Sequence, residues 1–182
     1  MSTALPFNDR AFKEAFEKIL SNGQFEKVIT EIAQLIYRNE LNKQSFDSLL
    51  EKHGVAQIEK IKPPLLDLLL LYINLILDDK YLTETEARNI KFLKRFFKIT
   101  EGDFYEYRYY DIEKILDRQF DHMYRDNKVD KGEALQKVAL QEIFDLGYDQ
   151  FLQLIEKAVQ AALDRGANVE DLDTFIKAGR LL

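Results

Sequence analysis

Four carboxylates hold matching places in two stretches of the sequence. Asp79 and Glu86 bound the segment DKYLTETE, and Asp126 and Glu133 bound the segment DNKVDKGE. If the two units pack about a pseudo-twofold axis, their loops can converge so that the four carboxylates face one another. Such a group either raises its own pKa values or holds a cation, and oxygen ligands select calcium or magnesium over zinc or copper. The four residues are therefore a candidate divalent-cation site.

The two glutamates also have a structural explanation. Thr83 with Glu86, and Asp130 with Glu133, match the capping-box pattern, in which the side chains at the helix start bond each other's backbone amides. On this alternative reading the loops only cap helices and hold no metal. Asp79 and Asp126 lie before the caps, so capping does not require them.

The two segments belong to a longer internal repeat. Residues 79–104 align with residues 126–151 at one constant offset and without a gap. The matched positions are helix landmarks, which indicates two helical units of the same design. The identities are Asp79/Asp126, Glu86/Glu133, Ala87/Ala134, Leu93/Leu140, Phe97/Phe144 and Phe104/Phe151.

The repeated segment resembles the motif of the TerB-like superfamily, small all-helical bacterial domains named after a tellurite-resistance protein. That motif reads Asp-Gly-x-aliphatic-Ser/Thr-x-x-Glu between helices, and Lys80 and Asn127 stand here in place of its glycine. The resemblance covers residues 63–178. It implies an acidic, cation-associated module linked to stress or membrane-associated complexes, and it implies no known reaction.

The elements that must position these residues are helices. We expect an all-α protein with a helical N-terminal extension at residues 1–62 and a TerB-like helical bundle with an internal two-fold repeat at residues 63–182. Pro63 and Pro64 suit the first turn of a helix, and the apolar run from Leu65 to Leu77 predicts a buried central helix. The other predicted helices span 9–20, 25–37, 45–53, 84–98, 103–124, 131–146 and 148–165, with a short last helix from Asn168.

A second candidate site is the aromatic stretch FYEYRYY. Tyr105, Tyr107, Arg108 and Tyr109 form a candidate partner-binding surface, because tyrosine and arginine are enriched at interaction hot spots. The alternative is a helix that uses some of these rings as core and leaves the hydroxyls in water. Because the three tyrosines alternate with other residues, a β-strand is also an alternative for this stretch.

Composition narrows the function. The formal net charge of -6 argues against a nucleic-acid binder. The sequence has no cysteine and only two histidines, which argues against most zinc sites and excludes a multi-histidine metal site. No signal peptide and no apolar run of about 20 residues is visible, so we expect a cytoplasmic protein without membrane insertion.

The leading hypothesis is a non-catalytic module that acts through protein contacts, with a divalent cation, calcium or magnesium, at the duplicated acidic loops. One alternative is a pure interaction or scaffold domain without metal. The other is a metal-dependent hydrolase, which ranks third because the sequence contains no recognisable nucleophile or phosphate-binding motif.

Overall fold

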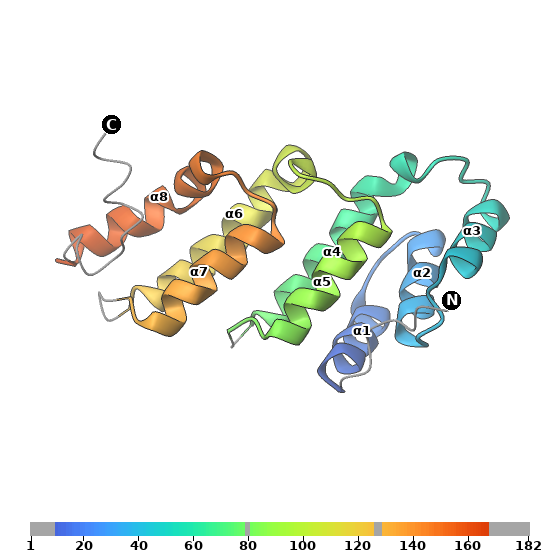
Figure 1. Ribbon diagram of the computed structural model, residues 1–182, viewed down its shortest axis with the longest axis horizontal. Helices are drawn as coiled ribbons and strands as arrows, with labels where there is room; N and C mark the ends of the chain where they lie inside the picture. Colours follow the sequence, from blue (N-terminus) through green and yellow to red (C-terminus); the bar gives the residue numbers. More distant parts are fainter. Residues whose placement is uncertain (1–9, 79–80, 126–128, 168–182) are drawn as a thin grey trace. The chain divides into compact units, whose positions relative to one another are not determined.

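The computed structural model describes residues 10–78, 81–125 and 129–167 (Figure 1). These residues form eight α-helices and one short 3-10 helix, and none of them lies in a strand, so the expected all-α class is confirmed. The short last helix predicted from Asn168 falls outside the described residues. The helices are α1 (Arg10–Asn22), α2 (Lys27–Tyr37), α3 (Lys43–Lys52), η1 (Ile58–Ile61), α4 (Lys62–Ile76), α5 (Glu84–Phe96), α6 (Asp103–Met123), α7 (Lys131–Ile143) and α8 (Tyr148–Asp164).

The chain divides into two compact units, residues 1–100 and residues 101–182. Helices α1 to α5 belong to the first unit and α6 to α8 to the second. The domain boundary expected between residues 62 and 63, just before Pro63 and Pro64, stays a prediction. Across the described stretches, no helix combines the length and apolar character that a membrane span requires.

Helix α4 is the central helix of the first unit. It packs against α1, α2, η1 and α5 (Figure 1). No side chain from residue 61 to residue 77 is exposed, and Leu65, Leu68 and Leu69 are fully buried. The prediction of a helix buried on most of its circumference is therefore confirmed.

The start of α4 explains how two prolines fit inside it. The helix begins at Lys62, directly after η1, so Pro63 and Pro64 occupy its first turn. The amides of a first turn have no acceptor within the helix, so proline costs little there. The sequence places the start near Leu65, and the structure places it three residues earlier.

Aromatic rings join α1 to α4. The ring centroids of Phe12 and Phe16 each lie 5.3 Å from that of Tyr72, and they lie 4.7 Å from each other. All three side chains are buried. Helix α1, which lies in the stretch expected as an N-terminal extension, therefore shares its core with α4.

In the second unit, α6 packs along α8. Phe104 meets Phe144 after α7 with centroids 5.5 Å apart, and Phe120 meets Phe151 of α8 at 5.8 Å. The tyrosine stretch is helical, which removes the strand alternative, but α6 bends at Arg108, whose φ of -139° and ψ of 30° are not helical.

Helices α5 and α7 have matching ends. Each bound of α7 lies 47 residues after the corresponding bound of α5. After the helices, Lys98 and Asp145 both adopt a left-handed conformation, with φ of 53° and 51°. The amides of the residues that follow them, Ile99 and Leu146, bond back to Lys94 and Gln141, which is the Schellman way of ending a helix.

We expect Leu70→Asp to destabilise the first unit strongly. Leu70 is buried on α4, and an unpaired charge in a core removes about 3 kcal/mol or more from the free energy of unfolding. Chemical denaturation measures the change. Leu135→Asp is a matched control, because Leu135 is an exposed leucine within a helix and should change stability by about 1 kcal/mol or less at low protein concentration. A normal unfolding curve for Leu70→Asp would mean that this side of α4 is not core.

Candidate functional site

The predicted capping boxes are both formed. At the start of α5, the Thr83 hydroxyl accepts from the Glu86 amide at 3.2 Å. Glu86 Oε2 in return accepts from the Thr83 amide at 2.9 Å and from its hydroxyl at 2.8 Å. At the start of α7, Asp130 Oδ1 accepts from the Glu133 amide at 2.8 Å, and Glu133 Oε2 accepts from the Asp130 amide at 2.8 Å. Each glutamate thus uses one carboxylate oxygen for capping.

The four-carboxylate cation site stays a prediction. Asp79 and Asp126 lie outside the described residues, and Glu86 and Glu133 belong to different units. Among the residues that the structure describes, no group of three or more aspartate, glutamate or histidine side chains is arranged to hold a metal ion. The part of the site that can be described is its two caps.

The four residues of the candidate partner surface lie in two different environments. Tyr107 is 44% exposed, and its neighbour one turn on, Tyr110, is 73% exposed. Tyr105, Arg108 and Tyr109 are only partly exposed. Tyr110 was not among the predicted residues, although it belongs to the same aromatic stretch.

The two half-buried tyrosines face α8. The Tyr105 hydroxyl donates to Gln153 Oε1 at 3.0 Å. The Tyr109 ring stands edge-on to the rings of Tyr105 and Tyr110, with centroids 5.2 and 5.4 Å away. Burial, followed by the charge of Glu113, raises the pKa of the Tyr109 hydroxyl. These contacts fix the position of the tyrosine stretch of α6 against α8.

A row of acidic side chains continues the α6 surface that faces α8. Lys157 Nζ pairs with Glu113 Oε1 at 2.8 Å, and this hydrogen bond raises the pKa of Lys157. One turn further, Asp117 Oδ1 is buried without a hydrogen-bond partner among the described residues. Burial and then the charge of Glu113 raise the pKa of Asp117, while Lys157 opposes them.

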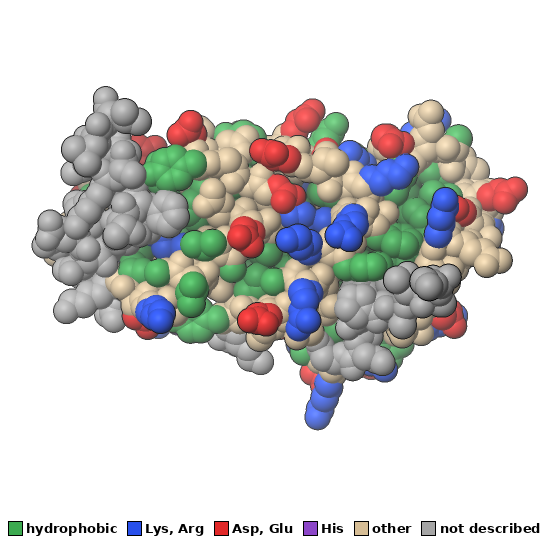
Figure 2. Space-filling model, viewed as in Figure 1, with side chains coloured by type: hydrophobic (Ala, Val, Ile, Leu, Met, Phe, Trp, Pro, Cys, Tyr) green, Lys and Arg blue, Asp and Glu red, His purple; other side chains and the backbone are tan. Residues whose placement is uncertain are grey.

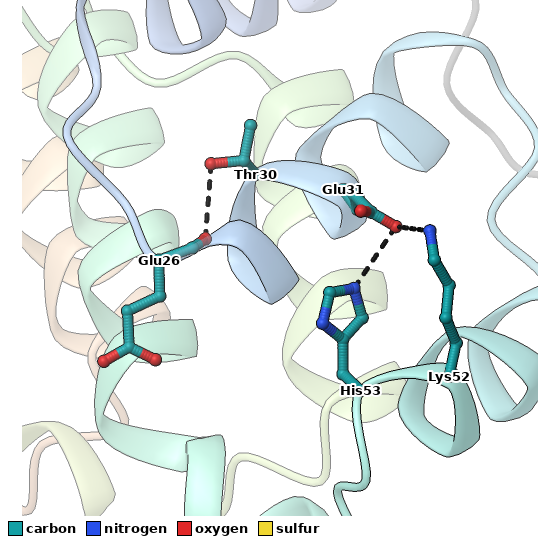
Figure 3. Close-up of polar contacts among 5 residues, drawn as sticks. All are labelled: Glu26, Thr30, Glu31, Lys52 and His53. Carbon is teal, nitrogen blue, oxygen red and sulfur yellow. Dashed lines mark hydrogen bonds and ion pairs between the residues drawn. The ribbon is translucent and has the colours of Figure 1, made fainter.

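A polar groove of about 540 Å³ opens between α2 and α3. Glu31 lies in it and meets Lys52 of α3 and His53 at the end of that helix (Figure 3). Lys52 Nζ is 2.7 Å from Glu31 Oε2, and His53 Nε2 is 3.3 Å from the same oxygen. The His53 contact is not aligned as a hydrogen bond, so it becomes an ion pair when the imidazole is protonated. The groove is lined by Lys27, Thr30, Glu31, Gln34, Leu35, Arg38, Leu49 and Lys52.

The remaining contact in Figure 3 is local. Thr30 Oγ1 donates to the carbonyl of Glu26, one turn earlier in the chain, at 3.3 Å. A threonine that bonds back to the preceding turn satisfies its own hydroxyl. Chemically, the groove is a polar surface with three flanking cations and one neutralised carboxylate.

A lysine lies inside the second unit. Lys137 on α7 is 1% exposed, its Nζ is 3.1 Å from the Tyr124 hydroxyl, and it is 5.5 Å from the ring centroids of both Phe120 and Tyr124. An ammonium group over aromatic faces is stabilised by their quadrupoles.

Sequence reasoning missed both Lys137 and the Glu31 cluster. The position of Lys137 could have been found, because it lies three and seven residues before the buried Leu140 and Phe144 and thus on their helix face. The pairing of Glu31 with Lys52 and His53 has no such signal, since it joins residues more than 20 positions apart. Both histidines lie at helix ends, His53 after α3 and His122 in the last turn of α6.

Comparisons of the chain with protein-family models, with curated proteins and with solved structures gave no match. The resemblance to the TerB-like superfamily therefore rests on the residues of the motif.

We expect Glu31→Gln to lower the melting temperature at pH 7. The hydrogen bond from Lys52, followed by the contact with His53, lowers the pKa of Glu31 in the folded protein. A lowered carboxylate pKa adds stability above the ordinary range of a glutamate, and this stability is lost as the pH falls through the lowered value. The difference between wild type and variant should therefore shrink towards acid pH.

The matched control is Glu51→Gln, which changes an exposed glutamate of α3. Its melting temperature should follow that of the wild type at every pH. Equal melting temperatures for Glu31→Gln and wild type at pH 7 would show that the charge of Glu31 adds nothing to stability. A gap that widens in acid would contradict the lowered pKa of Glu31.

Proposed function

We propose that this chain is a non-catalytic, cytoplasmic, TerB-like module that binds a protein partner through the tyrosine-rich face of α6. The observation that carries the proposal is the pair Tyr107 and Tyr110. They lie three residues apart on α6, on either side of the bend at Arg108, and both are exposed. The ring of Tyr110 also contacts the ring of Tyr109. Neither ring is needed to complete the core of its unit.

The surroundings of the pair favour binding. Tyr110 stacks edge-on against Tyr109, which stacks against Tyr105, and Tyr105 bonds Gln153 of α8. A chain of contacts of this kind holds the outer ring in place before a partner arrives, which reduces the entropy lost on binding. Tyrosine also supplies a large apolar area together with a polar hydroxyl, which suits an interface that is wet on one side.

Arg108 adds a second feature to this face. It lies at the bend of α6, and its Nη1 donates to the carbonyl of Tyr107 at 2.7 Å. The guanidinium therefore supplies a donor to the backbone beside the exposed ring. A partner that contacts Tyr107 would meet a fixed cationic group next to it, and arginine beside tyrosine is a common hot-spot composition.

We expect Tyr107→Ala with Tyr110→Ala to abolish partner binding and to leave folding intact. A protein retained from a lysate by the wild type, and lost with the double variant, is purified, and its affinity is measured by calorimetry. Truncating two hot-spot tyrosines should weaken binding by about 2 kcal/mol or more, roughly 30-fold.

Tyr37→Ala is the control for this experiment, because Tyr37 is an exposed tyrosine on α2 in the other unit. It should bind like the wild type. If the double variant binds as tightly as Tyr37→Ala, the tyrosine-rich face is not the binding surface.

A divalent cation at the duplicated acidic loops is the second candidate function. In its favour, both loops lead into the same structure: a capping box with the N-cap residue extended at φ of -78°, followed by helices of equal length. In the sequence, Asp79 and Asp126 each stand four residues before the N-cap residue of the helix that follows. In this proposal Asp79 and Asp126 supply oxygen ligands for calcium or magnesium.

We expect a thermal-shift titration with calcium, magnesium and manganese to test the cation site. Bound cation at about 100 times its dissociation constant adds about 2.7 kcal/mol to stability, and Asp79→Asn with Asp126→Asn should remove that gain. If the loops only cap helices, the double variant and the wild type melt alike in every metal. A wild type that responds to none of the three ions removes the cation site and leaves the partner surface unaffected.

A further inference from the structure

Helix α7 buries two polar side chains beside Leu140 and Ile143, and it exposes two apolar ones. Gln136 and Lys137 are 5% and 1% exposed, whereas Leu135 and Val138 are 64% and 39% exposed. A helix on the surface of a domain normally shows the opposite distribution. The outward apolar pair therefore needs an explanation beyond the folding of its own unit.

Helix α5 shows what the same positions hold when they face water. The residues of α5 that correspond to Leu135 and Val138 by place in the helix are Arg88 and Lys91, and both are exposed. Lysine and arginine side chains gather over α5, while hydrophobic side chains gather over α7 (Figure 2). Because the two helices have the same length and the same caps, the contrast lies in their outer faces.

The exposed apolar pair lies within a longer stripe. Lys131, Leu135, Val138 and Glu142, here called the α7 stripe, are all exposed. Their spacings of four, three and four residues place them along one side of the helix. The stripe thus has a cation at its N-terminal end, two apolar residues in its middle and an anion at its C-terminal end.

We propose that the α7 stripe binds the α7 stripe of a second copy of this chain in an antiparallel, twofold-symmetric pair. A twofold axis at the middle of the stripe places Leu135 against Val138 of the partner, and Val138 against its Leu135. The same axis places Lys131 opposite Glu142 of the partner at both ends. Each residue then contacts the residue that contacts it in return, which is the rule of an isologous interface.

Charge fixes the direction of this pairing. In a parallel pair, Lys131 would lie beside Lys131 and Glu142 beside Glu142, and like charges at such distances repel. In the antiparallel pair every charged contact is attractive. Ala134 and Ala139, which flank the stripe and are partly exposed, are small enough to let the two helices approach closely.

The size of the stripe sets the strength of the association. One pair of 13-residue helices buries less surface than the roughly 1,200 Å² of a standard stable interface. The dimer is therefore a weak one that forms and dissociates with concentration. This surface is separate from Tyr107 and Tyr110, so the inference goes beyond the proposed partner site.

Sedimentation equilibrium of the full chain from micromolar to millimolar concentration tests the pairing. The wild type should show a monomer–dimer equilibrium, and Leu135→Asp should remain monomeric. Lys131→Glu and Glu142→Lys should each raise the dissociation constant by about tenfold. The double exchange, with both substitutions in one chain, should restore dimerisation because the opposite charges meet again.

Lys114→Glu is the matched control, since it reverses an exposed charge on α6 outside the stripe; its dissociation constant should equal that of the wild type. Circular dichroism checks that each variant is folded. A wild type that stays monomeric throughout overturns the pairing and leaves the tyrosine-rich face to its own test. A double exchange that dimerises no better than the single variants overturns the antiparallel direction.

The absence of cysteine from the sequence allows a second test of register. Leu135→Cys and Val138→Cys then carry the only thiols. Because these positions face each other across the proposed axis, an oxidised mixture of the two variants should contain more disulfide-linked dimer than either variant alone. Equal cross-linking in all three samples overturns the register.

Discussion

Helix α4 has no exposed side chain, and the arrangement of the first unit follows from this constraint. A helix that is apolar around most of its circumference must be covered on most of its sides. Helices α1, α2 and α5 and the short η1 all contact it, and each turns its own apolar stripe inward, as Phe12 and Ile32 show. The polar faces of the covering helices are therefore outside, which is why Glu31, Lys52 and His53 meet in an open groove between α2 and α3.

In the second unit, α6 occupies the place in the chain order that α4 has in the first, but α6 is the more polar helix. The part of α6 after the bend at Arg108 runs to Met123, and these two positions lie 47 residues after Ile61, the N-cap of α4, and Ile76, its last residue. That correspondence supports the proposed duplication and extends it upstream of the aligned sequences. The places of Leu66 and Leu70 on α4 are taken on α6 by Glu113 and Asp117.

This substitution has an energetic consequence. Lys157 of α8 compensates Glu113 with an ion pair, but Asp117 keeps a buried oxygen without a partner among the described residues. Burial raises its pKa, so the charged form of Asp117 lowers stability at neutral pH, and that cost disappears as the pH falls through the raised value.

The features that the sequence predicted well are those with local causes. Helix bounds came close because caps such as Thr83 and Asp130 and stops such as Gly23 act within a few residues. The burial of α4 follows from composition alone. The bend at Arg108 and the η1 turn were not predicted, because no proline or glycine marks them. The Glu31 cluster joins two helices and could not be found by periodicity, and the placing of Asp79 and Asp126 stays open because neither residue is described.

Helix α7 places two polar residues in the core of the second unit and two apolar residues on its surface. Lys137 is held inside by the Tyr124 hydroxyl and by two aromatic rings, so a position on the inner face is occupied by a charge that a surface helix would normally place in water. The apolar residues of the same helix, Leu135 and Val138, are correspondingly on the outer face. A sequence under selection for folding alone gains nothing from exposing a leucine where α5 has an arginine. The outer face of α7 is therefore explained by contact with another surface, and its charge order selects a second copy of itself.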